Sequence, residues 1–194
     1  VVDDASSDRT ADEARIAGAE ILTHAINRGQ GAALRTGTEA ALARNADIIV
    51  HIDADGQHDP AFIPELVGPI VQGGADIVFG SRFMGVEAEG MPSSRRFLLM
   101  GARQFSALAL GLPRRITDPQ SGLRAMTAEA ARTLVFRQDR MAHCSEILLL
   151  AARSRFRVAE VPVRVRYTEG TLKKGQHAAD AAKIAWQLFM GAFH

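Results

Sequence analysis

The stretch that decides the fold reads Ile48-Ile49-Val50-His51-Ile52-Asp53-Ala54-Asp55-Gly56-Gln57-His58-Asp59-Pro60. Its first five residues form an apolar run that predicts a buried strand. The pair Asp59-Pro60 predicts a helix N-cap followed by proline at the first helical position. The two earlier aspartates therefore lie in a short loop between a strand and a helix. In open α/β folds, ligands bind at this edge of the sheet.

Asp53 and Asp55 are one residue apart and supply hard carboxylate oxygens. Such oxygens bind Mg²⁺ or Mn²⁺, and the ion keeps open positions for substrate phosphates. A solvated turn followed by a helix cap accounts equally well for this loop taken alone. Zinc is not favoured, although His51 and His58 are close in sequence, because no second pair of ligands has the usual spacing.

Length and composition predict one globular domain. The 194 residues suffice for one well-buried core, and no repeat or linker divides them. A net charge of +1 gives no general attraction to nucleic acid. The single cysteine, Cys144, excludes an internal disulfide framework and fits a reducing compartment. We see no signal peptide and no apolar stretch that could cross a bilayer, so we expect a cytoplasmic protein.

Strands alternate with helical segments, which predicts an α/β fold with a mostly parallel sheet covered by helices on both faces. The expected strands are residues 19–24, 46–52, 75–79, 123–126 and 157–167. The expected helices are residues 32–43, 59–72, 95–110, 145–154 and 178–193. A capping box of Thr10 and Glu13 opens an earlier helix, and Thr127 caps a further one. The chain starts at what reads as the end of a strand, so we expect the first strand to be missing.

Two segments near the start of the chain suit a nucleotide. Asp3 and Asp4 follow a strand and can accept hydrogen bonds from a base or from ribose hydroxyls. An ordinary loop with an Asx-turn explains them as well. Asn27 and Gly31 belong to a glycine-rich segment at a helix start, where the backbone attracts anions. A helix C-cap followed by an N-cap is an equally good account of that segment.

Arginines recur near the other strand ends. Arg82 follows a strand, and Arg95 and Arg96 open the next long helix. All three are candidates to hold phosphate groups. Arginines on a helix surface are more often simply solvated.

Two further acidic positions stand out. Asp118 lies with Ser121 in a segment of turn-forming residues that enters a strand, and a tight turn is sufficient to explain it. Glu146 opens a very apolar helix. It is either a partner of the helix dipole or a buried functional acid.

Together these segments resemble the family 2 glycosyltransferases of the GT-A fold. The similarity is to the subgroup of dolichol-phosphate mannose synthases and bacterial polyprenyl-phosphate glycosyltransferases. The matching segments, in family order, are VVDDASSDRT, NRGQGAALRTG, DADGQHDP, FGSRF, ITDPQSGLRAM and SEILLLAARSRFRVAEVPVRVRY. The combination of DADGQH and DPQSGLR is highly specific, and the match extends over nearly the whole chain.

The resemblance implies a role for each candidate residue. It implies catalytic roles for Asp118, which faces the transferred sugar, and for Glu146, as an acceptor-binding group or a base. It implies a metal site of Asp53, Asp55 and Gln57 for Mg²⁺ or Mn²⁺. The residues expected to bind substrate are Asp3, Asp4, Asn27, Gly31, Asp53, Arg82, Arg95, Arg96 and Ser121.

The implied activity is metal-dependent, inverting transfer from a nucleotide-diphosphate sugar, GDP-mannose or a UDP-sugar, to a polyprenyl phosphate. A sugar-phosphate nucleotidyltransferase and a catalytically impaired fragment that binds nucleotide sugars are the alternatives. Residues 1–194 are expected to form one N-terminally truncated GT-A domain. The helix at 176–194 is a candidate for peripheral contact with the cytoplasmic face of a membrane, although packing against the domain is favoured.

Overall fold

The structure, a computed structural model, describes residues 1–84, 116–118 and 121–166. The elements in chain order are β1 (Val2–Asp3), α1 (Thr10–Ile16), β2 (Leu22–Thr23), α2 (Gln30–Ala43), β3 (Ile48–His51), η1 (Pro60–Phe62), α3 (Ile63–Val71), β4 (Ile77–Ser81), β5 (Arg124–Thr127), α5 (Ala128–Thr133), α6 (His143–Arg153) and β6 (Val158–Pro162). The helices expected at 95–110 and 178–193 lie outside the described residues. None of the described helices has both the length and the apolar character needed to span a bilayer.

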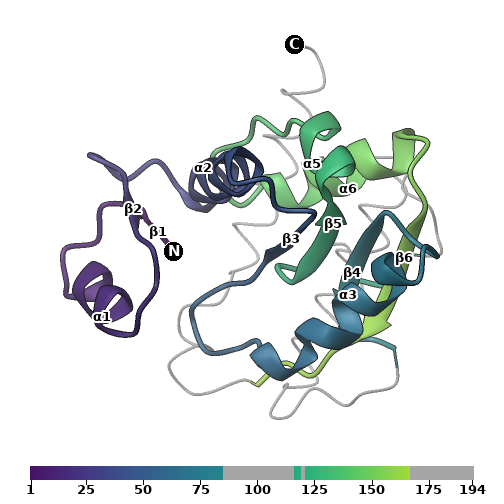
Figure 1. The fold of residues 1–194 in the computed structure, drawn as a ribbon, viewed down its shortest axis with the longest axis horizontal. Coiled ribbons are helices and arrows are strands. Elements are labelled where there is room, and N and C mark those ends of the chain that lie inside the picture. The colour runs from purple at the N-terminus through teal and green to yellow at the C-terminus, as the bar shows by residue number, and fades with distance from the viewer. Residues whose placement is uncertain (85–115, 119–120, 167–194) are drawn as a thin grey trace, which may run out of the picture.

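The main sheet has four strands in the order β3-β5-β4-β6. β5 is antiparallel to both β3 and β4, whereas β4 is parallel to β6. β3, β4 and β6 therefore point the same way, and β5 opposes them. β1 and β2 form a parallel pair of their own beside α1 (Figure 1). The mostly parallel sheet expected from the sequence is confirmed, with β5 as the strand that runs against the others.

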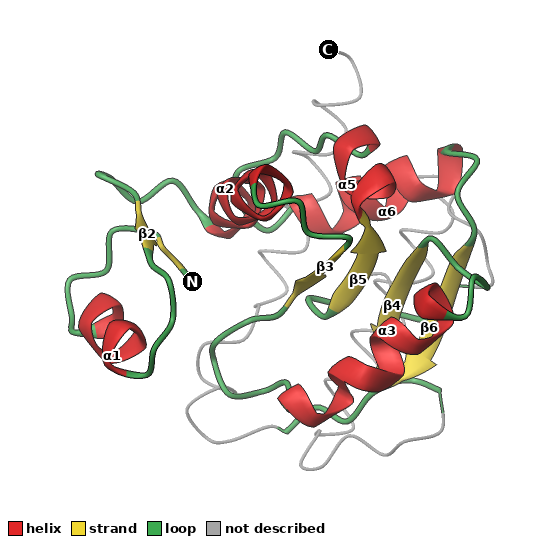
Figure 2. Ribbon diagram, in the orientation of Figure 1, coloured by secondary structure: helices red, strands yellow, loops and turns green. Residues whose placement is uncertain are grey.

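Helices cover both faces of the main sheet, as predicted. Ile77 and Phe79 of β4 belong to an apolar cluster that includes Ile147 of α6. Val78 lies between them in sequence and packs with Leu66 of α3 in a second cluster. Successive strand side chains point to opposite faces, so the two clusters lie on opposite sides of the sheet. Figure 2 shows α3 in front of β4 and β6. Full burial of one such side chain is worth about 1.5–3 kcal/mol.

Two predicted helix caps are confirmed by their hydrogen bonds. The Asp59 carboxylate accepts from the backbone N–H of Ala61 at 3.0 Å, with proline at the next position. The Thr127 hydroxyl accepts from the N–H of Ala130 at 3.1 Å and caps α5. These caps fix where the chain turns into a helix after β3 and after β5.

The capping box predicted for Thr10 and Glu13 is wrong. Helix α1 begins at Thr10 itself, and its N-cap residue Arg9 makes no side-chain cap. The Asp8 carboxylate instead accepts hydrogen bonds from the backbone N–H and the hydroxyl of Thr10, at 3.0 and 2.5 Å. A charged acceptor two residues earlier forms stronger hydrogen bonds than a neutral hydroxyl. The Asp8 carboxylate therefore binds the first N–H group of α1, and the Thr10 hydroxyl is used as a donor to Asp8.

Candidate active site

Three loops meet at one edge of the main sheet because β5 is reversed. The loops after β3 and β4 lie at the carboxyl ends of these strands. β5 runs the other way, so the loop before it reaches the same edge. This arrangement brings together Asp53 from the first loop, Arg82 from the second and Asp118 from the third. The first and last of these three predicted residues are 65 positions apart in the sequence, and Arg82 lies between them.

Arg82 and Asp118 form a two-point ion pair. Arg82 Nε donates to Asp118 Oδ2 at 2.6 Å, and Nη2 donates to Oδ1 at 2.7 Å. The backbone N–H of Arg82 also donates to Oδ2, at 3.2 Å. Asp118 is only 1% exposed. Such planar, charge-assisted pairs are among the stronger polar interactions in proteins, and this one joins two of the three loops.

The acidic loop after β3 is held on two sides. Gln30 Nε2 donates to Asp53 Oδ1 at 2.5 Å. Gly122 lies on the other side, where a Cβ atom would come within 3.0 Å of Asp53 Oδ2. Asp55 is exposed, and its Oδ1 accepts from the backbone N–H of Gln57 at 3.0 Å. The loop thus presents one braced carboxylate and one that faces solvent.

His58 lies among the charged residues of all three loops. Burial lowers its pKa. Among the charged groups near it, Asp53, Asp55 and Asp118 act to raise that pKa and Arg82 acts to lower it. His58 also forms an antiparallel bridge with Val165, just after β6. The charges of four predicted residues therefore all act on this one imidazole.

The described residues fit a divalent cation with few protein ligands. They contain no group of three or more His, Cys, Asp or Glu side chains that could hold a metal ion alone. Asp53 and Asp55 each keep one oxygen that accepts no hydrogen bond from the described residues. One or two carboxylates, with the remaining positions left to phosphate and water, are what Mg²⁺ sites near phosphates use. The donor chemistry suits Mg²⁺ or Mn²⁺ and does not suit a closed zinc site.

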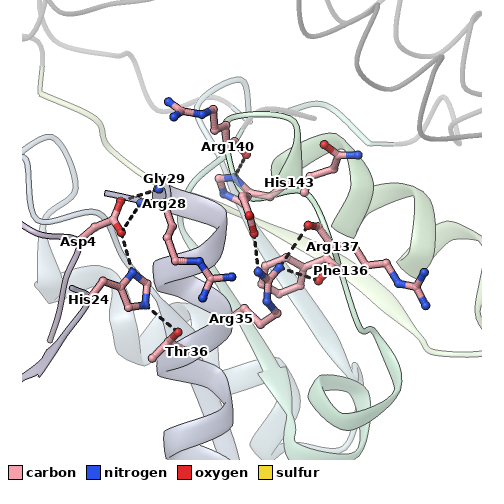
Figure 3. Close-up of polar contacts among 12 residues, drawn as sticks. Asp4, His24, Arg28, Gly29, Arg35, Thr36, Phe136, Arg137, Arg140 and His143 are labelled. Carbon is pink, nitrogen blue, oxygen red and sulfur yellow. Dashed lines mark hydrogen bonds and ion pairs between the residues drawn. The ribbon is translucent and has the colours of Figure 1, made fainter. Parts of the chain in front are cut away.

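Asp4 is the centre of a separate hydrogen-bond cluster next to α2 (Figure 3). Its carboxylate accepts from the backbone N–H groups of Arg28 and Gly29, at 2.9 and 2.6 Å, and lies 2.6 Å from His24 Nδ1. Desolvation acts to raise the pKa of Asp4, but these hydrogen bonds outweigh it and lower the pKa. Asn27 Nδ2 donates to the Asp4 carbonyl at 3.1 Å. The structure thus joins two of the predicted nucleotide residues, Asp4 and Asn27.

The other two predicted nucleotide residues lie beside this cluster. Asp3 is 4% exposed, and its Oδ1 is 3.4 Å from the backbone N–H of Ser6. At Gly31, a Cβ atom would lie within 3.0 Å of the Gln138 carbonyl. The loop between α5 and α6 therefore packs directly on the start of α2. Glycine is needed at position 31 for this close approach between two parts of the chain.

Glu146 anchors the same loop. Its carboxylate accepts from the backbone N–H of Arg137 at 3.0 and 2.9 Å, and from that of Gln138 at 2.8 Å. From the opposite side, Arg35 of α2 donates to the carbonyls of Phe136 and Arg137, both at 3.3 Å (Figure 3). Among the hydrogen bonds and ion pairs of the described residues, none joins Glu146 directly to Asp118.

The remaining predicted residues are less informative. Ser121 is 4% exposed, and its hydroxyl donates to the Leu123 carbonyl at 3.1 Å, so it shapes the turn before β5. The Gln57 carbonyl accepts from the backbone N–H of Arg166 at 3.0 Å. Arg95 and Arg96 lie outside the described residues.

Sequence reasoning missed several residues that shape the site. Gln30 and Gly122 both contact Asp53, and Glu160 of β6 bonds the loop that carries Asp118. Arg124 of β5 is completely buried, with its Nη2 3.8 Å from Cys144 Sγ. Glu160 and Arg124 could have been found from the sequence, because each is a charged residue within an otherwise apolar strand. The partners of Asp53 leave no such signal, because they depend on how distant segments pack.

Comparison with known proteins places this site in context. The family model described as "Glycosyl transferase family 2" matches residues 1–134. An uncharacterized protein of Methanocaldococcus jannaschii is 37% identical, over 98% of this chain and 79% of its own length. The UDP-N-acetylglucosamine–dolichyl-phosphate N-acetylglucosaminyltransferase of Methanococcus voltae is 35% identical, over 87% and 68%. The dolichol-phosphate mannosyltransferase of Pyrococcus furiosus is 33% identical, over 91% of this chain and 49% of its own.

Solved structures show the same fold. Glucosyl-3-phosphoglycerate synthase of Mycobacterium tuberculosis, in complex with phosphoglyceric acid, superposes with a TM-score of 0.64 and 26% identity. The same synthase in complex with Mn²⁺, UDP-glucose and phosphoglyceric acid gives a TM-score of 0.67 and 24% identity. Both matches cover 97% of this chain and 65% of the synthase. The chain thus spans somewhat less than two thirds of the synthase and about half of the Pyrococcus enzyme.

Proposed function

Because the chain belongs to glycosyl transferase family 2, we propose that it transfers a sugar from a nucleotide-diphosphate sugar to a polyprenyl phosphate, with the help of a divalent cation. The observation that carries this proposal is the meeting of Asp53, Arg82 and Asp118 at one sheet edge. Carboxylates for a cation and an arginine for phosphate are what a nucleotide diphosphate requires. We further propose that residues 1–194 act as one glycosyltransferase domain.

In this proposal Asp53 and Asp55 hold Mg²⁺ or Mn²⁺, with Gln57 as a third candidate. When bound, the cation neutralises the charge that develops on the departing diphosphate. The chain contributes the placement of the groups around it. Gln30 orients Asp53 through a hydrogen bond of 2.5 Å, and Arg82 is held by its ion pair with Asp118. Fixed groups of this kind need no reorganisation when the sugar leaves.

The two acids proposed for catalysis bear on the nature of the acceptor. Both oxygens of Asp118 accept hydrogen bonds from Arg82. Both oxygens of Glu146 accept from backbone N–H groups of the loop that they anchor. A hydroxyl acceptor needs a base that can take its proton, whereas the oxygens of both carboxylates already serve as acceptors for donors of the chain itself. A phosphate oxygen is already ionised near neutral pH, so a phosphate acceptor suits these acids better than a hydroxyl.

The names of the relatives agree with a lipid phosphate acceptor. The Methanococcus and Pyrococcus proteins are named for dolichyl phosphate, with N-acetylglucosamine and mannose as their sugars. We therefore propose a dolichyl or undecaprenyl phosphate as acceptor, and GDP-mannose or a UDP-sugar as donor, with inversion at the anomeric carbon. Such an acceptor requires contact with a membrane, which we propose for the cytoplasmic face and for the segment 176–194.

A donor screen tests this function. The protein is incubated with GDP-mannose and with several UDP-sugars, with and without a short polyprenyl phosphate, in Mn²⁺ or in EDTA. Mass spectrometry should detect a glycosylated lipid phosphate only with both substrates and the metal. Pyrophosphate release from a nucleoside triphosphate and a sugar phosphate would instead identify a nucleotidyltransferase. Calorimetric binding of a nucleotide sugar without transfer would identify a binding fragment.

A further inference from the structure

Glu160 is an acidic residue in the middle of β6. The sheet register pairs it with Phe79 of β4, which is only 3% exposed. Neighbours in register point to the same face of a sheet. The Glu160 side chain therefore leaves β6 on the face that carries the apolar cluster of Phe79. A carboxylate in such a place is costly unless hydrogen-bond donors surround it.

Three donors from one short segment surround the Glu160 carboxylate. Oε2 accepts from the backbone N–H of Thr117 at 2.8 Å and from its hydroxyl at 3.0 Å. Oε1 accepts from the backbone N–H of Asp118 at 3.0 Å. Glu160 thus bonds two consecutive N–H groups of the loop before β5, across more than 40 residues of sequence. Hydrogen bonds to a charged acceptor are about twice as strong as those between neutral groups.

The same segment is tied to the other loops of the site. The Thr117 hydroxyl lies 2.5 Å from that of Ser81, the last residue of β4. Arg82, the next residue, makes the two-point ion pair with Asp118. The backbone of Asp118 is therefore held by Glu160, while its side chain is held by Arg82.

We propose that Glu160 is the positioning residue that sets the Asp118–Arg82 pair for sugar transfer, a role that rests on the proposed function. Glu160 acts through its neighbours, because both of its oxygens are occupied by Thr117 and Asp118. A shift of about 1 Å at a reacting group can cost about 100-fold in rate. Through this effect on position, Glu160 should influence the rate of the chemical step more than the binding of the donor.

The test compares Glu160→Gln with wild type and with Glu129→Gln. Glutamine keeps the shape of Glu160, but its amide NH₂ faces one of the N–H donors instead of an acceptor. Glu129 is a matched control, since it is exposed on α5 and pairs only with the exposed Arg155 among the described residues. Two readouts are measured on the full chain. They are hydrogen exchange of the peptide that contains Thr117 and Asp118, and steady-state transfer kinetics.

In Glu160→Gln we expect faster exchange of that peptide and a kcat lower by about tenfold or more, with a smaller change in the donor KM. Glu129→Gln should match wild type in both readouts. Unchanged exchange in Glu160→Gln would contradict the claim that Glu160 holds the segment of Thr117 and Asp118 in place. Faster exchange with wild-type kcat, or a loss of kcat explained by unfolded protein in circular dichroism, would overturn the positioning role. Lack of transfer by wild type would count against the proposed function itself, whereas the exchange experiment would still test the anchor.

Discussion

The guanidinium of Arg82 and the carboxylate of Asp118 face each other in a planar pair, with donor–acceptor distances of 2.6 and 2.7 Å. The side chains are 12% and 1% exposed, so little water screens the two charges. Removing one partner of a buried pair leaves the other charge uncompensated. The loop after β4 and the loop before β5 therefore depend on each other for their positions.

Replacing Asp118 by Asn should destabilise the protein. The amide carries no charge and turns an NH₂ group toward the guanidinium, so we expect the free energy of unfolding to fall by about 3 kcal/mol. Urea unfolding of both proteins measures the difference. Asp12→Asn is the control, because Asp12 pairs with Arg15 on the exposed surface of α1 and should cost less than about 1 kcal/mol. Equal losses in the two variants would contradict a special role for the buried pair.

Asp55→Ala should abolish transfer while the fold is kept. Asp55 is exposed, and its one hydrogen bond among the described residues closes a turn, so we expect a stability change of about 0.5 kcal/mol or less. Mn²⁺ binding, followed by electron paramagnetic resonance, and lipid glycosylation should both be lost. Asp47→Ala is the matched control, since Asp47 is exposed just before β3 at the opposite end of the strand. Full turnover by Asp55→Ala would refute the metal assignment.

Gly122→Ala should weaken metal binding without a bulky substitution. The added methyl group would lie within 3.0 Å of Asp53 Oδ2, so the carboxylate must move. We expect a loss of Mn²⁺ affinity of about tenfold or more, in the range that disturbed supporting residues cause at metal sites. Gly68→Ala on α3 is the control, because the new methyl group meets no atom within 4 Å apart from its chain neighbours and the backbone of its own helix. Wild-type Mn²⁺ affinity in Gly122→Ala would show that Asp53 is not a ligand.

Stability should fall in mild acid because of His143. This side chain is completely buried, and burial, with a further contribution from Arg124, lowers its pKa to about 4. In the unfolded chain the pKa is about 6.5. Above that pH both states hold the neutral imidazole. As the pH falls from there to about 4, only the unfolded state gains the proton, which costs up to about 3 kcal/mol of stability.

The measurement is urea unfolding at several pH values across this window, on wild type and His143→Gln. Glutamine is neutral throughout and can still donate to the Arg140 carbonyl, which lies 2.9 Å from His143 Nδ1. The variant should lose less stability than wild type on acidification. The carboxylates titrate in both proteins, so their effect on stability cancels in the comparison. Parallel pH curves would show that His143 does not carry the effect.

The sequence predicted the local features of this fold best. Asp59 and Thr127 cap helices as expected, because a cap depends on residues only two or three positions apart. The direction of β5 could not be read from the sequence, since it depends on which strands become neighbours. The hydrogen bonds of Glu160 were missed for the same reason, because its partners are more than 40 residues away. At Thr10, a local rule failed because the nearby Asp8 competes as an acceptor.

The candidate site followed the same division. The acidic loop and Arg82 were identified from their residue types and their places after strands, and Asp118 from its place in a turn that enters a strand. The structure brings all three together. Gln30 and Gly122 were not singled out as partners of Asp53, because an amide and a glycine carry no sign of what they will touch. Which residues meet is decided by packing over the whole sheet.

β5 is paired along both of its edges, to β3 and to β4. A central strand of this kind cannot slide without breaking two ladders, so it fixes the spacing between the acidic loop and the Arg82–Asp118 pair. For protein engineering, this means that β5 can serve as a fixed part of the scaffold while the neighbouring loops are changed. Substitutions in the loops after β3 and β4 and before β5 should change which sugar is recognised. The spacing between these loops should stay the same.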